Sequence, residues 1–111
     1  MQFADFQKFI NEQDNLLRQA IHTGLSEKEI ALTRTVKLGE EFGELCDEVL
    51  ASFGNQRTGK MEKKDADGLA DEFADVTIVT FLLAKSMNID IMNALARKIE
   101  KIKTKHNQQL N

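Results

Sequence analysis

The sequence of 111 residues contains no proline and only one cysteine. Without proline nothing in the composition forces a helix to break, so a chain made entirely of helices is allowed. A single cysteine excludes an internal disulfide bond, which is typical of proteins in a reducing cytoplasm. Cys46 is better explained as a small core side chain than as a nucleophile. We therefore expect a cytoplasmic protein whose fold depends on packing alone.

The sequence also lacks a long hydrophobic run and an excess of positive charge. The longest apolar stretch, VTIVTFLLA at 76–84, is interrupted by threonines and is far shorter than the roughly 20 residues that a membrane-spanning helix needs. The N-terminal MQFADFQKF has no basic segment followed by an apolar one, so no secretory signal is predicted. The net charge is −3, which does not indicate a general surface for nucleic acid. We expect binding neither to membranes nor to nucleic acid polymers.

Helical periodicity and cap residues predict four helices. A chain of this length fits one domain, which would cover residues 1–111. Ser26 and Glu29 have the spacing of a capping box, and Asp90 is a good N-cap. The predicted helices cover about 2–22, 26–53, 63–87 and 91–105. With short connections they imply an all-α, four-helix bundle-like fold, and the apolar excess of the third helix indicates cover by a second subunit as well.

Two short motifs are similar to a phosphate-binding loop and a calcium-binding loop, but each lacks a residue or spacing that such a loop requires. In GNQRTGKM at 54–61, Met61 stands where a phosphate loop has the hydroxyl that meets magnesium, and the preceding segment is helical instead of a strand. In DADG at 65–68, Gly68 comes two positions too early for a calcium loop. We interpret the first as a glycine-rich turn and the second as a helix start.

Two acidic residues lie among the apolar side chains of the third predicted helix. On a helix that turns about 100° per residue, with Glu72 at 0°, Asp75 falls at about 300°. Leu82 and Val79 fall at about 280° and 340°, so both acids lie within the apolar arc. Burying an ionised carboxylate without compensation costs several kcal/mol. The sequence must therefore supply a partner, which could be a cation.

The second predicted helix offers a matching pair of acids. Glu41 and Glu44, at i and i+3, can converge at the rim of the core while Phe42 and Leu45 pack inside. Four clustered carboxylates repel one another and raise one another's pKa unless a positive charge lies between them. An all-oxygen set suits Mg²⁺ or Mn²⁺, whereas zinc and copper prefer histidine or thiolate. The remaining acids nearby are interpreted as solvated surface groups: Glu40, Asp47, Glu48 and Asp71.

A di-iron carboxylate bundle is the main competing metal site. It requires Glu-x-x-His on two helices. His22 follows Gln19 and His106 follows Lys103 at that spacing, so neither histidine has the required glutamate. We therefore favour a magnesium site over a di-iron site.

The two acidic motifs resemble the signature of the MazG-like nucleotide pyrophosphohydrolases, which belong to the all-α NTP pyrophosphatase superfamily. The signature is E-E-x-x-E followed by E-x-x-D, and the resemblance extends from about 35 to 103, while the N-terminal third is similar only in being helical. Here it reads Glu40-Glu41-Phe-Gly-Glu44 and Glu72-Phe-Ala-Asp75. The resemblance implies hydrolysis of a nucleoside triphosphate between the α and β phosphorus atoms, with Mg²⁺ held by Glu41, Glu44, Glu72 and Asp75. Glu40, or a ligand carboxylate of Glu41 or Glu44 that is not fully engaged, would accept the proton of the attacking water.

The resemblance also implies contacts from the last helix. Lys98 matches a lysine that the family commonly places there, so we expect it to bind phosphate. Ile102 stands where many relatives carry an asparagine that helps bind the nucleotide, so the sugar and base contacts would differ; Lys101, Lys105 or His106 could compensate. Without tryptophan or tyrosine, stacking on a base would use one of the seven phenylalanines. Relatives are dimers or tetramers whose active sites are bounded by helices of more than one subunit.

Three functions follow as hypotheses. The leading one is a Mg²⁺-dependent nucleoside triphosphate pyrophosphohydrolase that cleans or balances the nucleotide pool. The others are a non-catalytic helical module that dimerises or regulates, and an enzyme similar to phosphoribosyl-ATP pyrophosphohydrolases. The acidic pattern favours an enzyme, while Ile102 favours altered activity.

Overall fold

The computed structural model describes residues 1–54 and 63–110, and the side chains of 63–66 and 110 are left undescribed. Within these ranges the chain forms four helices and no strands, which confirms the predicted all-α fold. The helices are α1 (Phe3–Ala20), α2 (Glu27–Phe53), α3 (Lys63–Ser86) and α4 (Ile91–Leu110). The ends of α1 to α3 lie within two residues of those predicted, and α4 continues five residues beyond the predicted end. Most of GNQRTGKM lies outside the described residues, and DADG lies inside α3.

Local side-chain hydrogen bonds explain where two helices begin. At the start of α2 the Glu29 backbone amide donates to the Ser26 hydroxyl over 3.1 Å, and the Ser26 amide donates to the Glu29 carboxylate over 3.0 Å. At the start of α4 the Asn93 amide donates to Asp90 Oδ1 over 3.1 Å. The turn between α3 and α4 needs a left-handed residue, and Asn88, with a φ of 56°, provides it. These caps confirm the predicted helix starts.

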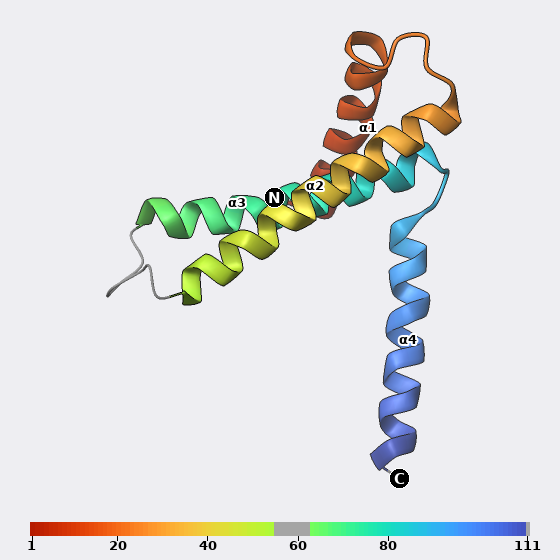
Figure 1. Ribbon diagram of the computed structural model, residues 1–111. Coiled ribbons are helices and arrows are strands. Elements are labelled where there is room, and N and C mark those ends of the chain that lie inside the picture. The colour runs from red at the N-terminus through yellow and green to blue at the C-terminus, as the bar shows by residue number, and fades with distance from the viewer. Residues whose placement is uncertain (55–62, 111) are drawn as a thin grey trace.

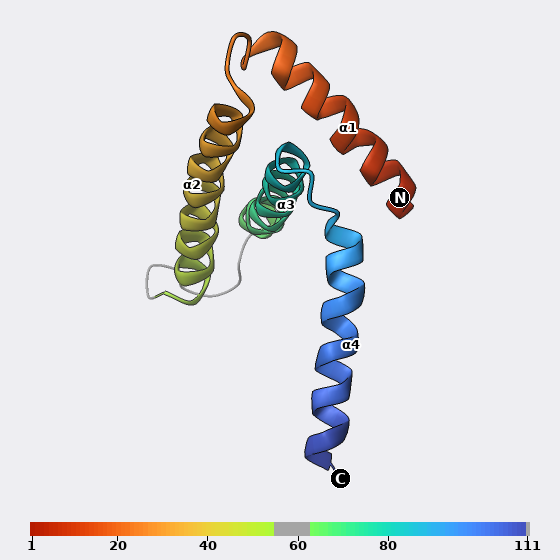
Figure 2. The same ribbon diagram turned by 90° about the vertical axis from the view of Figure 1, so that its right-hand side faces the viewer.

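The first three helices pack together, and α4 leads away from them. In the described part of the chain, the extensive contacts are those of α3 with α2 and with α1. The chain bends by 109° between α3 and α4, and α4 then extends away from the other helices (Figure 1, Figure 2). The radius of gyration is 17.8 Å, against about 13 Å for a compact domain of this length. The four helices therefore form an open arrangement instead of a closed bundle.

The open arrangement leaves few apolar side chains fully buried. Among the described residues the buried apolar side chains are Ile10, Ile30 and Leu82. Along α4, Leu95, Ile99 and Ile102 follow one another at helical spacing and are about half exposed. Phe42 is 59% exposed, so the expectation that it packs inside is wrong.

No single helix among residues 1–54 and 63–110 is long and apolar enough to cross a bilayer. Among the described helices, α3 and α4 taken together reach the required length and composition, and the chain is bent between them.

A buried ion pair joins the three packed helices. Arg34 of α2 donates from Nη1 to Asp14 Oδ1 of α1 and to the Leu82 carbonyl oxygen of α3, each over 2.7 Å. Asp14 also accepts from Arg18 Nε, and Arg18 donates in turn to Glu27 at the start of α2. Asp14 and Arg34 are 5% and 3% exposed. This network holds α1 against the pair formed by α2 and α3.

Asp14→Asn should destabilise the protein strongly because it leaves the Arg34 guanidinium buried without a counter-ion. We expect the free energy of unfolding to fall by about 3–5 kcal/mol, measured by urea denaturation. Glu12→Gln is the control, since exposed Glu12 pairs with exposed Lys8 at 4.0 Å, and it should change stability by less than about 0.5 kcal/mol. Equal effects of both substitutions would contradict the role given to the buried pair.

Glu29 should make stability depend on pH. Hydrogen bonds from the Ser26 backbone amide and then its side chain lower the pKa of Glu29 below its ordinary value of 4.5. A carboxylate with a lower pKa in the folded state contributes stability above its ordinary pKa and loses it as the pH falls through the lowered value. The stability lost in Glu29→Gln should therefore shrink between about pH 6 and about pH 3. Asp47→Asn, at an exposed position, serves as control, and a Glu29→Gln deficit that stays constant over this range would refute the effect.

Candidate metal centre

Carboxylates of α2 and α3 converge where the two helices pack. Glu41, Glu72 and Asp75 each offer one oxygen, and these oxygens all lie within 4.8 Å of one another. Glu41 is buried, Glu72 is half-buried and Asp75 is exposed. Since Arg34 of α2 bonds to Leu82 of α3, and Glu41 and Asp75 lie seven residues from them in opposite directions, antiparallel packing sets Glu41 opposite Asp75. Three of the four predicted ligands thus meet.

The fourth predicted ligand, Glu44, lies near this cluster without joining its closest oxygens. Glu44 is exposed. Its charge nevertheless acts on Glu72: the pKa of Glu72 is raised above its ordinary value of 4.5, first by burial and then by the negative charges of Glu44, Glu41, Asp75 and Glu48. Glu48, which is interpreted from the sequence as a solvated surface group, is half-buried and makes the smallest of these contributions. Glu48 follows Glu44 by one helical turn, which is the signal that could have identified it.

Two buried carboxylate oxygens in this cluster have no hydrogen-bond partner among residues 1–54 and 63–110. They are Oε2 of Glu41 and Oε2 of Glu72. An ionised oxygen withdrawn from water in this way is costly unless something positive meets it. An all-carboxylate oxygen set is the environment that hard divalent cations prefer. The residues present therefore fit a divalent metal ion, bound between α2 and α3.

A lysine one turn before the cluster holds the other oxygen of Glu41. Lys37 Nζ lies 3.1 Å from Glu41 Oε1 and 3.9 Å from Glu40 Oε2. The hydrogen bond to Glu41 and the attraction of its charge raise the pKa of Lys37 above its ordinary value. Because Lys37 engages Oε1 only, Oε2 stays available to a metal ion. The i, i+4 spacing of Lys37 and Glu41 could have revealed this pair.

The remaining predicted site residues do not join the cluster within one chain. Glu40 is exposed and pairs with Lys37. Lys98, Lys101 and His106 are exposed on α4, and Figure 2 shows this helix leading away from α2 and α3. Their predicted contact with phosphate stays a prediction.

A cavity of about 390 Å³ opens beside the acidic cluster. It lies between α1, α2 and α3, and its wall includes Glu41, Asp75 and Lys37 at one end and Arg34 and His22 at the other. Most of the remaining wall is aliphatic: Leu17, Ile21, Ile78, Val79 and Leu82. The cluster thus adjoins enough space for a small organic ligand.

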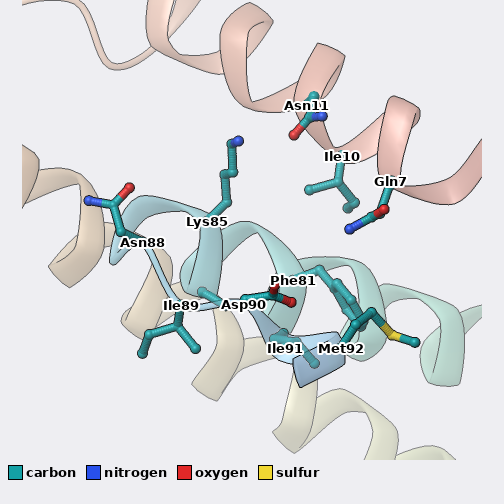
Figure 3. A pocket seen from close by; sticks show the side chains of 11 residues that line it. Gln7, Ile10, Asn11, Phe81, Lys85, Asn88, Ile89, Asp90, Ile91 and Met92 are labelled. Atoms are coloured by element: carbon teal, nitrogen blue, oxygen red, sulfur yellow. The ribbon is translucent and has the colours of Figure 1, made fainter. Parts of the chain in front are cut away.

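A second cavity, of about 270 Å³, lies at the bend between α3 and α4. Figure 3 shows the side chains around it, which come from α1, from the end of α3, from the turn after it and from the start of α4. Its wall includes Lys85, Asn88 and Asp90. None of the predicted site residues lines it, so it is separate from the acidic cluster.

Comparison with models of protein families gives a match that covers most of the chain. The family model described as MazG nucleotide pyrophosphohydrolase domain matches residues 27–110, which include α2, α3 and α4 and all of the clustered acids. A search of curated proteins and a search of solved structures found no match.

Removing one acid of the cluster should stabilise the metal-free protein and weaken its response to metal. Glu72→Gln removes a carboxylate that is partly withdrawn from water and repelled by neighbouring negative charges. In the presence of a chelator we therefore expect the variant to have a higher Tm than the wild-type protein. At Mg²⁺ or Mn²⁺ about 100-fold above Kd the wild-type protein should gain about 2.7 kcal/mol, seen as a clear rise in Tm by scanning calorimetry, and the variant should gain less. Glu12→Gln should behave as wild type. An equal metal response in wild type and Glu72→Gln would argue against metal binding at this cluster.

Proposed function

Because the chain belongs to the MazG nucleotide pyrophosphohydrolase family, we propose that it is a Mg²⁺-dependent nucleoside triphosphate pyrophosphohydrolase. It cleaves a ribo- or deoxyribonucleoside triphosphate between the α and β phosphorus atoms and releases the monophosphate and pyrophosphate. The observation that carries the proposal is the convergence of Glu41, Glu72 and Asp75, two of which have buried oxygens without a partner. Mn²⁺ is the alternative ion, since it prefers the same oxygen ligands. The role of such an activity is to remove or balance nucleotides in the pool.

Each acidic residue has a separate part in this proposal. Glu41 Oε2, Glu72 and Asp75 hold the cation, and exposed Glu44 turns in to complete the set. A divalent ion held by these carboxylates would neutralise phosphate oxygens and lower the pKa of the attacking water. Lys37 holds Glu41 by its other oxygen, so that Oε2 keeps its direction.

The proton of the attacking water goes to a carboxylate near the cluster. The water oxygen forms a bond to phosphorus, the bond to the bridging oxygen breaks, and its electron pair leaves with pyrophosphate. Glu40 is a suitable acceptor because it is exposed and adjoins Glu41. An oxygen of Glu41 or Glu44 that is not engaged with the cation is the alternative.

We further propose that the protein works as a homo-oligomer, either a dimer or a tetramer. The accessible surface is 8615 Å², against about 6,200 Å² for a folded monomer of this mass. The half-exposed apolar residues of α4 supply a stripe that another subunit would cover. In that arrangement Lys98, Lys101 and His106 reach the triphosphate bound at the cluster of a partner, because in its own chain α4 leads away from α2 and α3 (Figure 2).

Incubation with a panel of nucleoside triphosphates and Mg²⁺ should release pyrophosphate. Glu41→Gln and Asp75→Asn should each reduce turnover by more than the roughly 10- to 100-fold that loss of an outer-shell partner of a metal causes, with the helical circular dichroism unchanged. Glu12→Gln and Asp47→Asn are matched controls at exposed positions and should keep full turnover.

The same assay separates the alternatives. Absence of pyrophosphate with every nucleotide would favour the non-catalytic module, and release from phosphoribosyl-ATP alone would favour the enzyme of that class. Orthophosphate in place of pyrophosphate would show that another bond is cleaved. Full turnover in both Glu41→Gln and Asp75→Asn would remove the proposed site.

A further inference from the structure

The guanidinium group of Arg34 is hydrogen-bonded through Nη1, while its Nε–Nη2 edge is free. Its Nη1 donates to Asp14 and to the Leu82 carbonyl. Its Nε and Nη2 are buried and have no hydrogen-bond partner in the part of the chain that the structure describes. In the planar guanidinium group Nε–H and one Nη2–H point the same way, so together they form a side-on pair of donors. Buried donors are rarely left unpaired, because each costs about 1–3 kcal/mol. The free edge of Arg34 therefore indicates a ligand with two acceptors.

One cavity is lined both by Arg34 and by residues of the acidic cluster. Arg34 and Glu41 both line it, and they are separated by seven residues of one helix, or about 10 Å. Between them the cavity wall is formed largely by the aliphatic side chains of Leu17, Ile78 and Val79. A ligand that extends from the cluster to Arg34 therefore has a charged end at the carboxylates, a flat or apolar middle, and an acceptor edge at the guanidinium.

We infer that this cavity holds the nucleobase of the substrate and that the free edge of Arg34 selects bases with two adjacent hydrogen-bond acceptors. The inference rests on the proposed pyrophosphohydrolase activity and names the substrate class that it acts on. Guanine has such a pair in O6 and N7, and cytosine has one in O2 and N3. Adenine places an N6 amino donor beside N7, and thymine and uracil place N3–H between their two carbonyls. Guanine and cytosine nucleotides therefore fit, and adenine, thymine and uracil nucleotides leave one donor of Arg34 unpaired.

A phosphate group would also match a side-on guanidinium, but the surroundings favour a neutral base. Asp14 already balances the charge of Arg34, so an anion would add an uncompensated charge to a largely aliphatic cavity. The phosphates of the substrate are bound at the opposite end, where the cation and Lys37 lie. The free edge of Arg34 is therefore a specificity contact.

The unmodified protein provides the first test. We expect kcat/KM for dGTP or dCTP to exceed the values for dATP and dTTP by about tenfold or more, the usual worth of one bidentate contact. If guanine is the occupant, 7-deaza-dGTP, which lacks the N7 acceptor, should fall to the level of dATP. If cytosine is the occupant, dCTP should be preferred. Equal kcat/KM for the four nucleotides, preference for dATP or dTTP, or a preference for dGTP that 7-deaza-dGTP shares would overturn the inference.

Arg34→Lys tests the residue itself. Lysine keeps the charge that pairs with Asp14 but lacks the side-on pair of donors, so the preference for dGTP or dCTP over dATP should fall to about twofold or less. This ratio is measured within one protein sample, so partial unfolding of the variant cancels. Arg97→Lys, at an exposed position of α4, is the matched control and should keep the ratio of the wild-type protein. A uniform loss with all four nucleotides in Arg34→Lys would overturn the inference, since it would show a phosphate contact or a purely structural role.

Binding of nucleoside monophosphates without metal separates this inference from the proposed activity. By calorimetry in the presence of a chelator, dGMP or dCMP should bind at least about tenfold more tightly than dAMP and dTMP. Such selective binding without pyrophosphate release in any assay would uphold the base site and refute the pyrophosphohydrolase. Pyrophosphate release from all four triphosphates, with equal binding of the four monophosphates, would refute the base site alone.

Discussion

Mutual repulsion of carboxylates between α2 and α3 is the constraint on which the site depends. Antiparallel packing of these helices brings one oxygen each of Glu41, Glu72 and Asp75 within 4.8 Å of one another. It also leaves one oxygen of Glu41 and one of Glu72 buried without a partner. The protein alone offsets this charge only in part, through Lys37 on the far oxygen of Glu41. A bound divalent cation would offset the remainder, so the same packing that costs stability in the free protein would create affinity for metal.

The same pair of helices balances its other buried charge internally. Two turns along α2 from Glu41, Arg34 is neutralised by Asp14, and this bond anchors α1 over the cavity. One end of the cavity therefore carries negative charge that suits a cation. The other end has two hydrogen-bond donors of Arg34 that suit the acceptors of a neutral group. A nucleotide with a bound cation would suit both ends, with its cation at the carboxylates and its base at Arg34. The long, half-exposed α4 lies outside this unit, and cover by another copy would both bury its apolar stripe and bring its basic residues to a triphosphate.

The features that could be predicted from the sequence are those set by neighbours along the chain. Helical periodicity and the caps at Ser26 and Asp90 located the helices because cap bonds form within three residues. The turn of about 100° per residue likewise predicts that Glu72 and Asp75, three residues apart, share one face of the helix. Features that depend on contacts between helices escaped prediction. The bond between Asp14 and Arg34 joins positions twenty residues apart, and the exposure of Phe42 and the direction of α4 follow from which faces the other helices cover.

The most direct test is an anomalous difference map from crystals soaked in Mn²⁺. The account predicts a peak between α2 and α3, with oxygens of Glu41, Glu72 and Asp75 at about 2.0–2.6 Å and Glu44 turned toward it, while Lys37 keeps its bond to the other oxygen of Glu41. Crystals in which Mn²⁺ binds elsewhere, or in which this cluster stays free of manganese at saturating concentration, would contradict it.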